Sequence, residues 1–112
     1  MNQIAIISSL PKIIETLIEE SILKKAVERN VLKLKIFNLR EYGLGKKKQI
    51  DDAPFGGGGG MVLMPEPLFN AIEDAISWMK NKDMIRVILP SPSGKKWDQV
   101  FAEKFSKKKS II

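Results

Sequence analysis

Residues Gln3–Ser8 read QIAIIS, a short run rich in β-branched side chains. Such a run suits a strand that is buried on both faces, as strands of a parallel sheet are. Pro11 follows at a position typical of the first turn of a helix. The apolar residues after it recur at helical spacing, at Ile13, Ile14, Leu17 and Ile18. The sequence therefore predicts a buried strand that leads directly into a helix.

Strand-like and helix-like segments alternate along the rest of the chain. Ser21 is placed to cap a second helix ending near Asn30. Pro65 opens a third helix with the apolar stripe Leu68, Ile72, Ala75, Ile76 and Met79, and a short fourth helix is indicated around Trp97–Phe105. We expect Trp78 and Trp97 to pack in the core. Strands are predicted at Gln3–Ser8, Val31–Leu39, Met84–Leu89 and Ser110–Ile112. This alternation predicts an α/β fold with a mainly parallel sheet flanked by helices, in a single domain over residues 1–112.

For two of these strands the sequence also predicts a position at the edge of the sheet. In Val31–Leu39, apolar residues alternate with Lys33 and Lys35, which predicts a half-exposed strand near a sheet edge. Ser110–Ile112 starts a strand late in the chain, and we expect it to leave an open edge that drives association with another chain.

Composition limits the possible functions. The 112 residues are 44% hydrophobic and 29% charged, include neither cysteine nor histidine, and carry a net charge of +6. Thiolate metal sites and a Ser-His-Asp triad are therefore excluded, and we expect no metal. No apolar run is long enough to cross a bilayer, which favours a cytoplasmic protein without a membrane partner. The positive charge suits a polyanion such as RNA, or else marks ordinary solvated loops.

The segment of about residues 40–60 shows no apolar period and is predicted to be a long flexible loop. It contains IDDAPFGGGGGM at Ile50–Met61, which matches neither a P-loop nor a dinucleotide fingerprint. Carboxylates can accept hydrogen bonds from a guanine edge, while the upstream lysines hold phosphates. The alternative is a disordered surface loop, and the residues alone leave both readings open. A catalytic pair formed by Asp51 and Asp52 is disfavoured, because adjacent side chains in an extended chain point apart.

The segment Leu89–Gly94, LPSPSG, follows a predicted strand. Its two prolines fix the backbone and remove N–H donors, so exposed carbonyls could frame a flat heterocycle such as adenine. An ordinary turn from a strand to a helix has the same composition.

Together these segments resemble the bacterial tRNA (guanine-N1)-methyltransferase family, TrmD. The resemblance rests on IISSLP at Ile6–Pro11, the glycine loop with its lysines, MVLMPEPL at Met61–Leu68, and ILPSPSGKKWDQ at Ile88–Gln99. It implies a SPOUT-class enzyme with a Rossmann-like sheet and a trefoil knot. Such enzymes act as homodimers and use S-adenosylmethionine to methylate N1 of the guanosine 3′ of the anticodon, tRNA position 37.

The resemblance also assigns residues. It implies that S-adenosylmethionine is bound by Leu89, Pro90, Ser91 and Pro92. It implies that the tRNA is bound by Lys47, Lys48, Asp51, Gly56, Gly57, Gly58, Gly59 and Gly60. Phe55 stands where the family usually has tyrosine, and Ala53 where it has arginine, so RNA contacts are reduced.

The family's sequences continue well past Ile112. We therefore expect the catalytic residues beyond Ile112 and interpret the chain as the N-terminal portion of a SPOUT domain, inactive by itself. A basic RNA-binding module and a structural remnant without catalysis are the alternatives; no DNA partner is expected.

Overall fold

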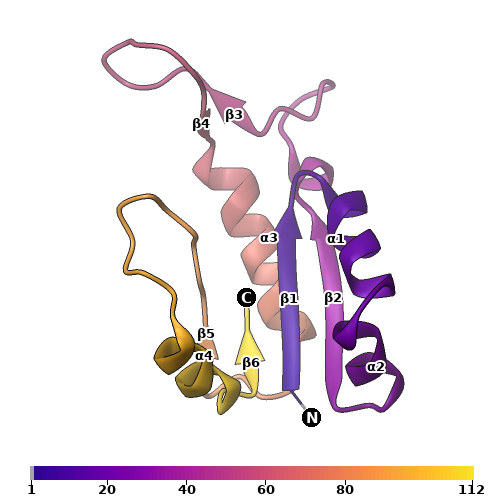
Figure 1. The fold of residues 1–112 in the computed structure, drawn as a ribbon. Coiled ribbons are helices and arrows are strands. Elements are labelled where there is room, and N and C mark those ends of the chain that lie inside the picture. Colours follow the sequence, from indigo (N-terminus) through magenta and orange to yellow (C-terminus); the bar gives the residue numbers. More distant parts are fainter. Residues whose placement is uncertain (1) are drawn as a thin grey trace.

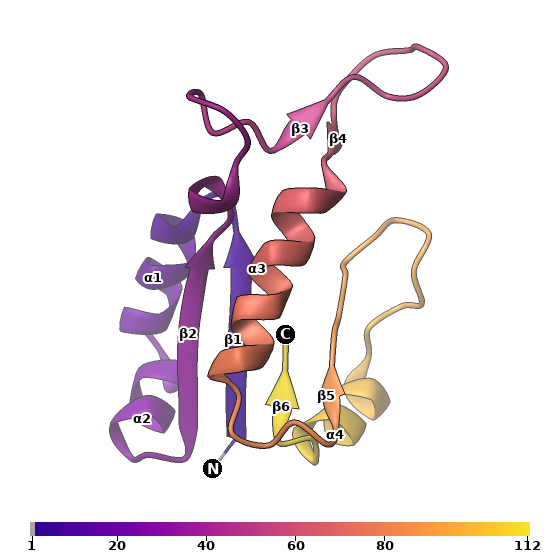
Figure 2. The ribbon, with the colours of Figure 1, turned by 180° about the vertical axis from the view of Figure 1, so that it is seen from behind.

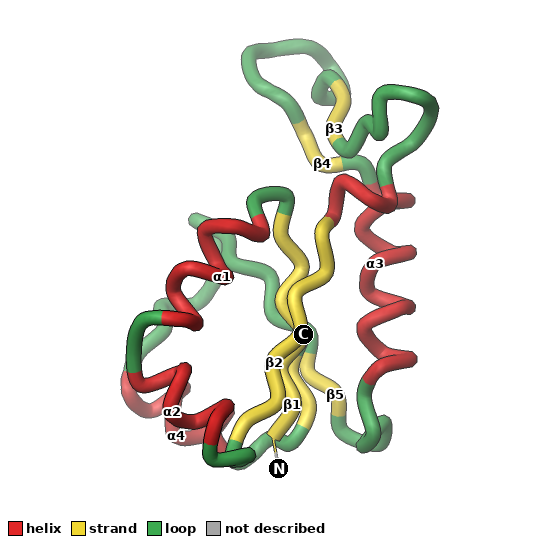
Figure 3. Tube along the Cα trace, turned by 90° about the vertical axis from the view of Figure 1, so that its right-hand side faces the viewer, coloured by secondary structure: helices red, strands yellow, loops and turns green. Residues whose placement is uncertain are grey.

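The computed structural model describes residues 2–112, which form an α/β fold with a mainly parallel sheet, as predicted. The elements in chain order are β1 (Asn2–Ser8), α1 (Pro11–Glu19), α2 (Ile22–Glu28), β2 (Leu32–Asn38), the 3-10 helix η1 (Leu39–Tyr42), β3 (Asp51–Asp52), β4 (Val62–Leu63), α3 (Pro65–Trp78), β5 (Ile85–Arg86), α4 (Gln99–Ser106) and β6 (Ser110–Ile111). Figure 1 shows their course. Figure 3 views the sheet edge-on, with α3 on one side and α1, α2 and α4 on the other.

β1 lies inside the four-stranded sheet, whose order is β2-β1-β6-β5 with parallel neighbours throughout. It pairs with β2 over its full length, from Asn2 opposite Leu32 to Ser8 opposite Asn38. Ala5 is buried, but Ile4 and Ile6 are only half-buried because they line an apolar groove described below. The predicted strand is confirmed, but its burial on both faces is incomplete.

The position of β6 corrects one expectation. Ser110 pairs with Gln3 of β1 and with Ile85 of β5, and only 1% of Ser110 is exposed. Ser110–Ile112 is therefore not an open edge, and the edges of the sheet are β2 and β5. Local sequence pattern reports whether a segment is a strand, but strand order depends on contacts between distant segments.

β5 is shorter than the predicted strand Met84–Leu89. Regular pairing covers Ile85 and Arg86, and beyond them the Ile88 N–H donates to the Ile112 carbonyl at 2.7 Å. Pro90 and Pro92 follow closely, and proline cannot donate to a ladder, so regular pairing ends early.

β2 confirms the predicted edge strand. Its residues alternate between half-buried leucine or isoleucine and exposed lysine until Phe37, which is buried. Lys33, Lys35 and Phe37 share the face toward α3, where Phe37 contacts Trp78 edge to face with ring centroids 6.3 Å apart.

α3 covers the face of the sheet that Figure 2 turns toward the reader. Its buried residues Pro67, Ala71 and Ala75 recur every fourth position, and Met79 continues the row just past the helix. The predicted stripe is confirmed at Ala75 and Met79, whereas its other members, Leu68, Ile72 and Ile76, are only half-buried. Alanine at the contact lets the helix approach the sheet, and Ala5, Phe37, Ala75 and Met79 form the main core cluster. Within residues 2–112, no helix is both long and apolar enough to span a membrane.

The two tryptophans differ. Trp78 packs against the main core cluster, as expected. Trp97 is 54% exposed, stacks on Phe101 and lies tilted against Phe105, with ring centroids 6.0 and 5.4 Å away, so its predicted place in the core is wrong. Helical spacing brings Phe101 and Phe105 of α4 together, and Trp97 lies against both from just before the helix.

The segment around residues 40–60 is more regular than predicted. It begins in η1, continues through a paired turn at Leu44 and Gln49, and enters an antiparallel hairpin in which Asp51 lies opposite Leu63. Ile50 is 6% exposed and packs in a second cluster with Leu39 and Ala71. Each pairing covers only one or two residues, which is too short to leave a periodic pattern. Flexibility of the remaining loop, residues 53–61, stays a prediction.

Candidate nucleic-acid interface

The residues predicted to bind RNA gather at one end of the molecule. Figure 1 shows the β3–β4 hairpin and the turn before it beyond the carboxyl ends of β1 and β2. The loop between β5 and α4 rises toward the same end. In parallel α/β sheets this is the end where ligands bind.

Lys46, Lys47 and Lys48 occupy a preformed turn, here called the lysine turn (Leu44–Gln49). Its ends exchange two backbone hydrogen bonds, from Leu44 N–H to the Gln49 carbonyl at 2.8 Å and from Gln49 N–H to the Leu44 carbonyl at 2.9 Å. Gly45 and Lys48 adopt positive φ, of 71° and 50°, which closes the turn. All three lysines are exposed. The turn thus presents three cations from a fixed backbone, an arrangement suited to phosphates.

Tyr42 fixes the base of this turn to α3. Its hydroxyl donates a hydrogen bond to Asp74 Oδ2 at 2.7 Å, and its ring packs against both core clusters. Burial, then the hydrogen bond to Asp74 and the negative charges of Asp74 and Glu41, raise the pKa of Tyr42 to about 12. Sequence reasoning missed this anchor, although Tyr42 is the only tyrosine and lies in a segment with few apolar residues.

This pKa predicts a stability change at high pH. The folded state holds the Tyr42 proton more tightly than the unfolded chain, whose pKa is the ordinary 10.0. The resulting stabilisation is complete below pH 10 and lost as pH rises through about 12. We expect the free energy of unfolding, measured in urea, to fall over this range, and Tyr42→Phe to remove that part of the fall. Because the chain has one tyrosine, tyrosinate absorbance gives its pKa directly, and a midpoint at 10 would contradict the assignment.

The glycine loop, residues 56–60, is open backbone. Gly56, Gly57, Gly58 and Gly60 have φ between 82° and 104°, a region where side chains are rarely tolerated. A Cβ at any of the five glycines would meet nothing within 4 Å. Glycine is therefore required here by backbone conformation at four positions. The Gly57 N–H donates to the Pro54 carbonyl at 3.3 Å, while the other four N–H groups make no hydrogen bond within residues 2–112.

A small hollow of about 310 Å³ lies beside this loop. Phe55, Leu63 and Met64 give it apolar walls, and Asp52 and Glu66 give it carboxylates. Asp52 Oδ1 accepts a hydrogen bond from the Ala53 N–H at 2.7 Å, whereas Asp51 is the preceding residue of β3 and does not line the hollow. The structure thus brings Asp51 and the glycines onto one hairpin but puts Asp52 at the hollow. Glu66 was missed because an acid in the first turn of a helix has an ordinary structural explanation.

The segment Leu89–Pro92 borders a different cavity. Leu89 and Pro90 line a groove of about 500 Å³ between α3 and the sheet, in which every lining residue is apolar. Ser91 and Pro92 lie outside it, and Ser91 forms a turn by accepting the Gly94 N–H at 3.0 Å. The expected ligand of this segment, S-adenosylmethionine, contains an adenine and a charged amino-acid group. An apolar wall fits the face of the adenine, but the charged group needs polar partners, which this groove lacks. The groove and the hollow share no lining residue.

Comparisons with known proteins agree with this picture. Residues 2–112 match the family model described as tRNA (Guanine-1)-methyltransferase TrmD. A tRNA (guanine-N(1)-)-methyltransferase of Methylacidiphilum infernorum is 47% identical over 110 residues, which are 98% of this chain and 46% of the relative. The corresponding protein of Caldanaerobacter subterraneus subsp. tengcongensis is 42% identical over 106 residues, which are 95% of this chain and 42% of that protein.

The fold matches as well. The crystal structure of tRNA (m1G37) methyltransferase from Aquifex aeolicus superposes with a TM-score of 0.82 at 31% identity, over 98% of this chain and 48% of that one. The chain spans less than half the length of these relatives. The shared sequence and the shared fold lead to one conclusion: the chain belongs to the TrmD family of tRNA (guanine-1)-methyltransferases.

Proposed function

We propose that these residues form the RNA-receiving part of an S-adenosylmethionine-dependent methyltransferase that modifies N1 of the guanosine 3′ of the tRNA anticodon, position 37. The observation that carries the proposal is the joining of three elements in one continuous segment, namely the lysine turn, the carboxylates of β3 and the glycine loop. Lys47 and Lys48 supply charge for phosphates, while Asp51 and the backbone of Gly56–Gly60 supply acceptors and donors for a guanine.

The cofactor belongs to the same proposal. Leu89, Pro90, Ser91 and Pro92 form the first wall of the S-adenosylmethionine pocket, with the adenine against the apolar side of Leu89 and Pro90. When bound, the cofactor supplies the methyl group. The groups that hold its amino-acid moiety and the base that takes the N1 proton lie outside these 112 residues. The complete enzyme acts as a homodimer in the cytoplasm, where its substrate is found.

A binding experiment tests the RNA side. The chain should bind an anticodon stem-loop in a salt-dependent manner, and Lys46→Gln/Lys47→Gln/Lys48→Gln should lower the slope of log affinity against log salt by about 2, at roughly 0.7 per phosphate contact. Fluorescence anisotropy at several salt concentrations measures this slope.

A matched control removes the same charge elsewhere. Lys107, Lys108 and Lys109 lie between α4 and β6, at the opposite end of the sheet in Figure 1. Substituting these three by glutamine should leave most of the affinity intact. Equal losses in both variants would mean that net charge alone attracts RNA, and undetectable binding by the unmodified chain would favour a structural remnant.

A further inference from the structure

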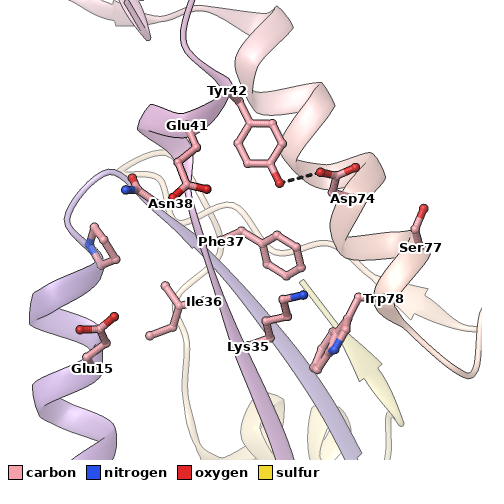
Figure 4. A pocket seen from close by; sticks show the side chains of 11 residues that line it. Glu15, Lys35, Ile36, Phe37, Asn38, Glu41, Tyr42, Asp74, Ser77 and Trp78 are labelled. Carbon is pink, nitrogen blue, oxygen red and sulfur yellow. Dashed lines mark hydrogen bonds between the residues drawn. The ribbon is translucent and has the colours of Figure 1, made fainter. Parts of the chain in front are cut away.

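A trough runs along the free edge of β2, at a distance from the glycine loop. Its volume is about 640 Å³, and four consecutive residues of β2, Lys35–Asn38, line it. Consecutive residues of a strand point to opposite faces, so a cavity that touches all four lies beside the edge of the strand rather than over one face. Figure 4 shows β2 between Glu15 of α1 and the side chains of α3.

The backbone of β2 has hydrogen-bonding groups available at this trough. Within residues 2–112, β2 pairs with β1 alone, so its outer side has no partner strand. Every second residue of an edge strand turns its N–H and C=O outward. An extended peptide that adds as a further strand would satisfy these groups, a mode of recognition in which main-chain bonds give affinity and side chains give specificity.

The walls of the trough are acidic in a basic protein. Glu15, Glu41 and Asp74 line it against the single cation Lys35, while the whole chain carries a net charge of +6. Overall electrostatics would therefore attract an acidic partner, and only this local environment favours a basic one.

The aromatic rings of the trough already hold cations. Lys35 Nζ lies 5.0 Å from the centroid of the Phe37 ring, and Lys33 Nζ lies 5.6 Å from that of the Trp78 ring. Lysines on an edge strand usually hinder pairing by projecting from it. Here both ammonium groups fold back over rings, which leaves the edge open and shows that the α3 side of the trough accommodates positive charge.

We propose that this trough, which we call the β2 trough, docks an extended basic segment of a partner protein by strand addition to β2. Alternate arginine or lysine side chains of that segment face Glu15 on one wall and Glu41 or Asp74 on the other. The site uses no residue of the lysine turn or the glycine loop, but it borders the anchor of that turn, because Tyr42 and Asp74 also line the trough.

Fluorescence anisotropy tests the charge requirement with a labelled octapeptide of alternating arginine and threonine, at about 0.15 M salt, where distant charges are screened. Glu15→Lys/Glu41→Lys reverses two exposed charges in the trough and should weaken binding by about tenfold, which corresponds to about 1.4 kcal/mol. Glu20→Lys/Glu103→Lys makes the same change on exposed residues that line neither the trough nor the adjoining cavity along β2, and should weaken binding by less than about twofold. Equal effects of the two double variants would overturn the proposal.

Amide hydrogen exchange by NMR tests strand addition in the unmodified chain. The peptide should protect alternate amides between Lys33 and Asn38 and leave the opposite edge, Ile85–Arg86, unchanged. Binding that protects no β2 amide would reduce the site to a charge contact and refute docking by strand addition. Protection that appears without peptide and grows with protein concentration would show a second copy of the chain as the occupant, which also contradicts the proposal.

Discussion

Purified residues 1–112, incubated with S-adenosylmethionine and a tRNA that carries guanosine 3′ of the anticodon, should transfer no methyl group above background. N1 of guanine becomes a useful nucleophile only when a base within hydrogen-bond reach removes its proton. Asp52, the carboxylate of the hairpin that lines the hollow, already accepts a hydrogen bond from the backbone of Ala53. Asp51 lies in β3 opposite Leu63 and does not line the hollow.

Placement of the methyl donor gives a second reason. Transfer needs the donor carbon in line with N1 at near-attack distance. The hollow beside Asp52 and the groove beside Leu89 have no lining residue in common, so the two reactants are not brought into one cavity by these residues. We expect incorporation several orders of magnitude below that of a full-length relative assayed in parallel. Labelled N1-methylguanosine produced by the chain alone, verified by nucleoside analysis, would show that the base is among these residues.

Gly43→Ala should disrupt the lysine turn even though Gly43 has an ordinary negative φ of −62°. A Cβ at this position would overlap both the carbonyl carbon and the carbonyl oxygen of Lys48. These are backbone atoms, which cannot move aside without opening the paired turn at Leu44 and Gln49. Overpacking of this kind costs about 1–3 kcal/mol. We expect that loss in the free energy of unfolding, together with a weaker affinity for an anticodon stem-loop.

Gly59→Ala is the matched control. Gly59 has open space around its Cβ position and, unlike the other four glycines of its run, no positive φ. Alanine there should be neutral or stabilise by about 0.4–1 kcal/mol, because it restricts the unfolded chain more than the folded one. Unfolding in urea measures the free energy of unfolding of both variants, and we expect only Gly43→Ala to lower it. Similar stability of the two would mean that the backbone around Gly43 rearranges easily and that the turn is not preformed.

The sequence predicts the type of most elements because periodicity and capping are local. Ser21 accepts the Leu23 N–H at 3.3 Å and Asn30 ends α2 with φ of 56°, as their residue types indicate. Strand order is not local, which is why the place of Ser110 inside the sheet was not predicted. The part of the α3 stripe that was wrong has a similar origin, since the small Ala71 is buried where close approach of the backbone matters more than side-chain size.

The candidate site was predictable in part. The glycine run and the lysines are visible as composition, and the structure places them at one end of the sheet. The Tyr42–Asp74 hydrogen bond joins residues 32 positions apart, and no local pattern links them. The β2 trough is likewise formed by residues of α1, β2 and α3, so its acidic character is invisible in a chain whose overall charge is positive.

The order β2-β1-β6-β5 also bears on how the chain folds as it leaves the ribosome. More than a hundred residues separate Gln3 from its partner Ser110, and synthesis at ~5–20 residues per second takes roughly 5–20 s to cover that distance. β1 and β2 can pair early, whereas β5 has no neighbour in the sheet until β6 arrives. The sheet therefore cannot grow outward one strand at a time: β6 is synthesised after β1 and β5, and it must enter between these two segments already made.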